Sequence, residues 1–141
     1  MVRLRRFVGC LLLSLVPPVL VTVATAPTRA SESAFPFDRE LMLDAAPLPG
    51  SKRVPTIEIG ENGAAAIDLW CTSVRGQASV DADSISIVPG GPAQPAQCVP
   101  ERQRGDENLL AALAQVTSWR RQGDILELRG ATTLRFRLMT N

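Results

Sequence analysis

The sequence predicts an α+β fold: a curled, barrel-like antiparallel β-sheet of about seven to eight strands, with one helix inserted before the last three strands. Short apolar–polar alternations separated by turn residues run through most of the chain, as in VPTIEIG and TLRFRL. Residues 106–116 instead place their leucines at helical spacing. The change from alternation to helical spacing and back indicates a helix packed on an antiparallel sheet.

Residues 1–30 are predicted to be a cleavable secretory signal peptide. Three arginines form a basic start, residues 7–26 are almost wholly apolar, and Thr28-Arg29-Ala30 supplies small residues at a cleavage position. About 20 apolar residues could also span a bilayer, so an uncleaved membrane anchor is the alternative. Cleavage predicts a periplasmic or secreted protein that touches a membrane only if the segment is retained.

Export changes the charge and the cysteine count. Removing residues 1–30 takes away four arginines and no acid, which leaves 11 basic residues against 14 acidic ones and a formal charge of −3. This negative net charge, together with the small number of aromatic residues, excludes a nucleic-acid-binding surface.

The remaining cysteines, Cys71 and Cys98, predict a disulfide, with two separate buried thiols as the alternative. Because the chain has no His, we expect no metal and no other cofactor.

The front half of the domain is expected to consist of strands. Residues 31–36 are predicted to be a disordered tail and residues 37–141 the folded domain. Phe37–Leu43 is expected as the first strand, and the Pro-rich stretch that follows as a loop. Turn signals at Glu61-Asn62-Gly63 and Asp81-Ala82-Asp83 then separate strands expected at residues 54–60, 64–71, 74–80 and 84–88. The Pro-rich segment through Pro100 is expected to be a loop that Cys98 holds to the sheet.

The back half is expected to be one helix and three strands. Asp106 is the expected N-cap, with Glu107 in the first turn, where the helix dipole favours an acid. The helix is expected to pack an apolar face on the sheet, made of Leu109, Leu110, Leu113 and Val116. Alternation then predicts strands at residues 117–121, 125–129 and 134–138.

Three stretches carry a family resemblance. The first stretch contains a strand pair, a Cys and a Gly-containing step: LPGSKRVPTIEIGENGAAAIDLWCTSVRGQASVDADSISI. The second places another Cys before the helix: Cys98-Val99-Pro100. The third contains the closing helix, hairpin and strand: ENLLAALAQVTSWRRQGDILELRGATTLRFRL. Together they resemble the META/HslJ-like domain family of small bacterial envelope proteins. Two positions depart from the family pattern, because Trp70-Cys71-Thr72 replaces Gly-Cys-Asn and Pro95-Ala96-Gln97-Cys98 replaces Thr-x-x-x-Cys. The resemblance implies an envelope location and a link to heat shock or envelope stress, and it implies no reaction.

Catalytic residue types are scarce. There is no His or Tyr, and Lys52 is the one Lys, in the Pro-rich loop, so we expect no enzymatic activity. A Ser–Lys hydrolase built on Lys52 is the alternative. Asp68 would have a raised pKa if it faced inward, but strand alternation favours an outward position. Asp81 and Asp83 lack calcium-loop spacing and are expected to be turn residues.

The candidate partner surface consists of Trp70, Trp119, Arg120 and Arg121. Exposed tryptophans would form an apolar patch and the arginines a basic rim for acidic partners or lipid headgroups. The alternative is that the tryptophans pack in the core and the arginines are solvated.

The first hypothesis for the function is an exported, non-catalytic domain, expected to be a monomer, that binds a protein partner or supports structure. The second is a carrier of a small apolar ligand, with a cavity lined by Ile57, Ile59, Ile85, Ile87 and Leu126.

Overall fold

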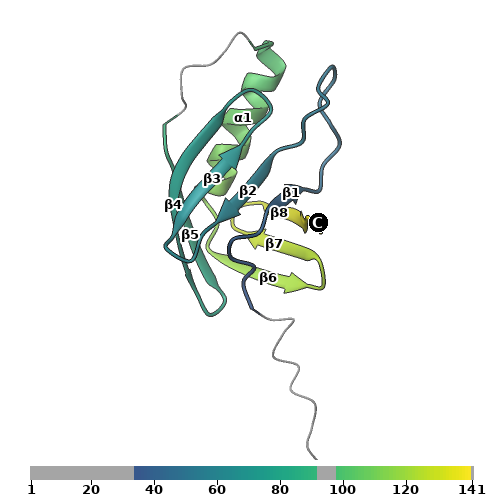
Figure 1. Cartoon of the computed structure of the whole chain (residues 1–141). Helices are drawn as coiled ribbons and strands as arrows, with labels where there is room; N and C mark the ends of the chain where they lie inside the picture. The colour runs from purple at the N-terminus through teal and green to yellow at the C-terminus, as the bar shows by residue number, and fades with distance from the viewer. Residues whose placement is uncertain (1–33, 92–97, 141) are drawn as a thin grey trace, which may run out of the picture.

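The computed structural model describes residues 34–91 and 98–140 (Figure 1). Eight antiparallel strands form a closed barrel in which each strand pairs with its sequence neighbour and β1 pairs with β8. The strands are β1 (Leu41–Leu43), β2 (Thr56–Ile59), β3 (Ala64–Asp68), β4 (Ser73–Asp81), β5 (Ser84–Pro89), β6 (Ser118–Gln122), β7 (Ile125–Arg129) and β8 (Thr133–Leu138). One helix, α1 (Pro100–Leu113), connects β5 to β6. The predicted fold class is confirmed, while the predicted signal peptide lies outside the described residues.

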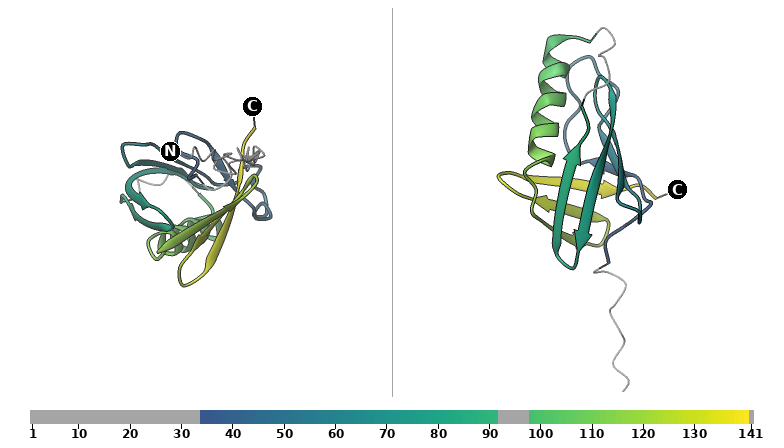
Figure 2. Two further views of the ribbon diagram at one scale, coloured as in Figure 1. Left: turned by 90° about the horizontal axis from the view of Figure 1, so that it is seen from below. Right: turned by 90° about the vertical axis from the view of Figure 1, so that its left-hand side faces the viewer.

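The barrel closes at a narrow seam between β5 and β6. These two strands share one residue pair, Ser84 and Ser118, extended by a hydrogen bond from the Ile85 N–H to the Thr117 carbonyl. The helix inserted between them in sequence lies alongside β5 (Figure 2, right). In the same view the yellow strands of the carboxyl-terminal half run across the direction of β4 and β5. No helix in the described residues is long and apolar enough to cross a membrane.

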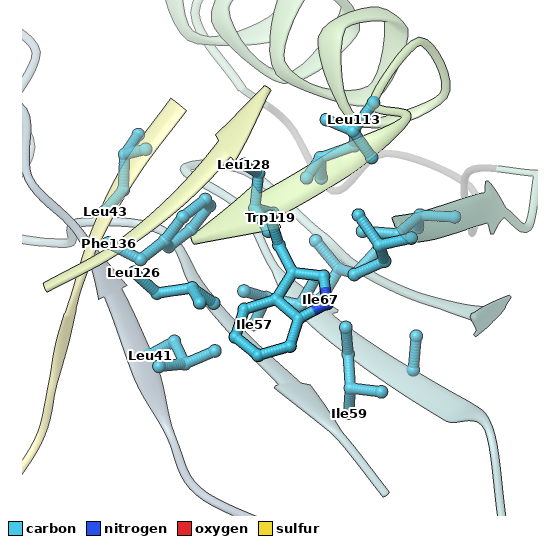
Figure 3. Packing of buried hydrophobic residues seen from close by; sticks show 14 of the residues in the cluster. Leu41, Leu43, Ile57, Ile59, Ile67, Leu113, Trp119, Leu126, Leu128 and Phe136 are labelled. Carbon is cyan, nitrogen blue, oxygen red and sulfur yellow. The ribbon is translucent and has the colours of Figure 1, made fainter. Parts of the chain in front are cut away.

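Apolar side chains fill the interior of the barrel (Figure 3). Alternate residues of each strand point inward, and the Trp119 indole lies among them. Tight packing of this kind is usual for protein interiors. Five of these side chains are the ones that the carrier hypothesis placed around a cavity, and they are 0–3% exposed in one cluster: Ile57, Ile59, Ile85, Ile87 and Leu126. The structure therefore places them in a packed core.

The helix begins earlier than the sequence analysis predicted. Its N-cap is Val99, and Pro100 occupies the first helical turn, where a missing N–H has no consequence. Asp106, predicted as the N-cap, lies in the helix interior and is 5% exposed. The N-cap prediction is therefore wrong, because the residues that precede Asp106 already form helical turns.

The predicted apolar face of the helix is largely buried. Leu109 and Leu113 contribute to the core, whereas Leu110 is half-buried against it. Val116 is also buried but lies beyond the last helical residue, Leu113. The face thus continues past the helix end into the turn that leads to β6.

The domain also begins before residue 37. Phe35 and Pro36 are buried, so a disordered tail over residues 31–36 is wrong for these two positions. The Phe35 ring packs edge-on against Trp119 with ring centroids 5.1 Å apart. β1 is shorter than predicted, because Asp38 has a positive φ of 54° and donates its N–H to the Ile59 carbonyl before the strand begins.

Candidate functional site

The predicted disulfide is present between Cys71 and Cys98, whose Cα atoms are 5.9 Å apart. Cys71 lies in the turn between β3 and β4, and Cys98 lies two residues before the first residue of α1. The bond therefore fixes the entry to the helix against one end of the sheet.

The same turn is held by Asp106. The turn is closed by a hydrogen bond from the Leu69 N–H to the Thr72 carbonyl. Its inner N–H groups donate to the Asp106 carboxylate, Trp70 to Oδ1 at 2.9 Å and Cys71 to Oδ2 at 3.1 Å. Burial raises the pKa of Asp106, and the N–H groups of Cys71, Trp70 and Thr72 lower it by less. Both carboxylate oxygens are engaged by the backbone, so Asp106 is a structural acceptor.

Trp70 packs beneath the helix. Its side chain is half-buried against the core, and it lies close to Gly105. A Cβ at Gly105 would lie 3.1 Å from Cε3 of Trp70 and 2.9 Å from Cδ1 of Leu48. The Trp70 Nε1 is buried without a hydrogen-bond partner among the described residues. Trp70 is thus a packing residue between α1 and the loop before β2.

The structure does not bring the predicted partner surface together. Trp119 is 8% exposed in the core, while Arg120, the next residue, points outward. Arg121 lies at the end of the barrel, where its Nε donates to the Gly123 carbonyl at 2.9 Å. The backbone N–H of Trp119 donates a hydrogen bond to the Asp83 carbonyl in the turn after β4, whereas Trp70 lies in the turn before β4. The two tryptophans are therefore associated with opposite ends of β4. The alternative of core packing for the tryptophans describes the structure better.

Arg120 belongs instead to a set of arginines on the outer face of β6, β7 and β8. Glu127 is opposite Arg120 on one side and opposite Arg135 on the other. Arg129 is two residues along β7 on the same side, since alternate residues share a face. Arg137 is two residues along β8. We call the outer surface formed by Arg120, Glu127, Arg129, Arg135 and Arg137 the arginine face; its four arginines are exposed.

Glu127 lies at the centre of the arginine face. Its Oε2 accepts a hydrogen bond from Nη2 of Arg129 at 2.7 Å. That hydrogen bond lowers the pKa of Glu127, and the charges of Arg129, Arg135 and Arg120 lower it further. At the edge of the face, Arg137 lies 3.4 Å from the Asp44 carboxylate. Arg120 and Arg135 form no salt bridge within the described residues, so their guanidinium groups are available to a ligand.

Lys52 and Asp68, the candidate catalytic residues, form no ion pair with each other among the described residues. Lys52 is exposed in the loop before β2. Asp68 is exposed, as strand alternation predicted, and accepts a hydrogen bond from the Ser73 hydroxyl across the β3–β4 pair. The Asp68–Ser73 pair lies on the outer surface of the sheet. In the described part of the chain, no group of three or more His, Cys, Asp or Glu side chains could hold a metal.

A surface groove of about 470 Å³ lies between the β4–β5 hairpin and the end of α1. Its lining includes four hydroxyl groups and the buried apolar residues Ile85 and Val116. The hydroxyl groups belong to Ser79, Ser84, Ser86 and Thr117. The side chains of these four residues are largely exposed, so the groove is open to water.

The arginine face was not predicted from the sequence. Arg120 and Arg121 were expected to act as a pair, although successive strand residues point to opposite sides. The sequence Gln122-Gly123-Asp124 predicts the turn between these strands, and the structure has it there, with a positive φ of 58° at Gly123 that suits a tight hairpin connection. A two-residue turn after Gln122 sets the register that aligns Arg120 with Glu127.

Comparisons with known proteins agree with this architecture. A solved NMR structure of a protein from Burkholderia xenovorans has a TM-score of 0.60 and 19% sequence identity, covering 74% of this chain and 84% of that one. A second NMR structure has a TM-score of 0.54 and 19% identity, covering 71% of this chain and 88% of that one. At this identity the likeness shows the fold alone. A comparison with curated proteins found no significant match. The model of the META domain matches residues 39–141, so the chain belongs to the META domain family.

Proposed function

We propose that the protein is an exported, non-catalytic domain that works by binding an anionic partner through the arginine face. The observation that carries the proposal is the uneven distribution of charge. Three guanidinium groups lie around the Glu127 carboxylate on a single sheet face and a fourth lies at the edge, although residues 31–141 have a formal charge of −3. A local positive field on a chain of net negative charge attracts anions to that face and sets the orientation of encounter.

The surroundings of the acids and the core support a binding role over catalysis. The Asp106 oxygens are occupied by backbone N–H groups, and both members of the Asp68–Ser73 pair are exposed on the outer surface of the sheet. The filled core gives the ligand-carrier hypothesis no support. A link to heat shock or envelope stress, which the family resemblance implied, stays a prediction.

Retention on a polyanion tests the binding proposal. Residues 31–141 carry the described core, which is built between Phe35 and Leu138. This processed form would be applied to a sulfated-polysaccharide resin at low salt and eluted with a salt gradient. A face variant would combine Arg120→Gln, Arg129→Gln and Arg135→Gln. We expect it to elute at clearly lower salt than the wild type, because the positive field is removed.

A matched control separates position from total charge. The control variant would carry the same change at three exposed arginines elsewhere, on the loop before β2, on β4 and on α1: Arg53→Gln, Arg75→Gln and Arg104→Gln. It should elute close to the wild type. Equal loss of retention in both variants would overturn the proposal, since net charge alone would then explain binding.

Export has its own test, the intact mass of the protein recovered from the cell envelope, with and without reductant and thiol alkylation. A mass of residues 31–141 less two hydrogens would support cleavage and the disulfide together. A full-length mass with free thiols would contradict export by a cleaved signal peptide and would remove the oxidising compartment in which such a disulfide persists.

A further inference from the structure

We propose that the anionic partner is the surface of a phospholipid bilayer, against which the domain lies with the arginine face on the headgroups. This inference rests on the proposed function and names its partner. It depends on how the cations are spread, on the apolar residues beside them and on what lies at the centre of the face.

The guanidinium groups are spread over an area. Neighbouring strands lie about 4.8 Å apart, so Arg120 and Arg135, two strands apart, have backbones separated by roughly 10 Å. Arg129 lies on β7, the strand between them, two residues beyond Glu127. A site for a single phosphate would need several donors that converge on one point. Separated cations on an open sheet face match an array of charged headgroups better.

Apolar residues stand beside the cations. Met42 of β1 and Ile125 of β7 are the two cross-strand neighbours of Arg137, so all three lie in one row on the outer side. Both apolar residues are half-buried, and Met139, beyond the end of β8, is 37% exposed. An arginine with apolar neighbours suits the membrane interface, because its stem can pack at the acyl boundary while its head reaches phosphate.

The centre of the face is unlike that of a protein interface. Specific protein interfaces usually place buried aromatic or aliphatic anchors at their centre and charges at the rim. Here the order is reversed, since the Glu127–Arg129 ion pair occupies the centre and the apolar residues lie at one edge. An acidic protein partner is therefore the less favoured occupant and becomes an outcome of the test.

Binding of this kind would be weak and sensitive to salt. If each arginine near an anionic bilayer strengthens binding by roughly fivefold and Glu127 weakens it by the same factor, the apparent dissociation constant is on the order of 10 mM accessible lipid. Such attraction falls off within a Debye length of about 10 Å at 0.1 M salt. Binding should therefore be measured at low ionic strength and should disappear in high salt.

Vesicle co-sedimentation tests the inference. Residues 31–141 would be mixed with vesicles of phosphatidylcholine alone or with phosphatidylglycerol added. We expect binding to the anionic vesicles alone, a loss of about 100-fold in the face variant, and near wild-type binding in the control variant. Glu127→Gln removes the central negative charge and should strengthen binding by about fivefold, whereas Glu58→Gln, at an exposed position on β2, should have a smaller effect.

Each other outcome has a definite meaning. Retention on the polyanion resin without binding to anionic vesicles would overturn the bilayer and leave the proposed function intact, with an acidic protein or polysaccharide as partner. Failure of both would overturn both. Equal binding to neutral vesicles, or equal losses in the face and control variants, would also overturn the inference, because the arginine face would then not be the membrane contact.

Discussion

The carboxylate of Asp106 accepts a hydrogen bond of 3.1 Å from the backbone N–H of Cys71, one of the two disulfide cysteines. The helix and the β3–β4 turn are therefore joined twice, once through Cys98 before the helix and once through Asp106 inside it. The covalent link restricts how far the two elements can separate, and the carboxylate fixes how the turn is oriented.

Replacement of Asp106 by Ala should lower the free energy of unfolding by about 1–3 kcal/mol, because the N–H groups of Trp70 and Cys71 would lose their acceptor. Urea denaturation of the oxidised protein at neutral pH measures this. Glu107→Ala, at the exposed neighbouring residue, removes the same charge and should have little effect. Equal midpoints for the two variants would show that the turn does not depend on the carboxylate.

The stability of the protein should also depend on the protonation of Asp106. Burial raises the pKa of Asp106 above its ordinary value of 3.8, so the folded state holds this proton to higher pH than the unfolded chain does. The resulting stabilisation is complete below the unfolded pKa and is lost as pH rises through the folded pKa. From below 3.8 to neutral pH, the wild type should lose stability relative to Asp106→Asn, which carries no such proton.

Thermal melts of both proteins at a series of pH values give this difference directly. All other acids titrate in both proteins and cancel in the subtraction. A difference that stayed flat, or that favoured the wild type as pH rose, would mean that the hydrogen bonds from the turn outweigh burial and that the folded pKa of Asp106 is not raised.

The helix shows where sequence patterns succeed and where they fail. Its second half was predicted because Leu109 and Leu113 recur at helical spacing and enter the core. Its first half was missed because it contacts the loop before β2 and the β3–β4 turn through Arg102, Gly105 and Asp106, which have no apolar signal. Pro100 was an available marker of the helix start.

The strands were predictable because alternation and turn residues are local features. The arginine face was not assembled from them, because it depends on the register of three strands. Alternation alone places Glu127 and Arg129 on one side of β7, but only pairing brings Arg120 and Arg135 beside Glu127. Long-range register is a property of the folded sheet, and the hairpin turns constrain it one pair at a time.

Gly105→Val should destabilise the protein, because the added side chain would enter the space held by Trp70 and Leu48, where even a Cβ lies 2.9 Å from Leu48 Cδ1. Overpacking of this kind costs about 1–3 kcal/mol. Glu107→Val, on the exposed part of the same helix, controls for the lower helix propensity of Val. Denaturation midpoints and tryptophan fluorescence would be compared. An unchanged emission spectrum and midpoint for Gly105→Val would contradict the close packing of Trp70 under the helix.

Phe35→Ala should destabilise the domain by about 3 kcal/mol, the lower end of the range for a buried Phe, because the residue lies near the chain end. The ring is 8% exposed and packs edge-on against Trp119 and at 4.8 Å from Phe37, so its removal exposes the indole and leaves a gap in the core. Ala34→Gly, at the exposed preceding residue, is the control. The measurements are the urea midpoint and the tryptophan emission wavelength, which should shift to the red as the Trp119 indole is exposed. A stable variant with unchanged emission would mean that the folded domain begins after Phe35, as the sequence alone had indicated.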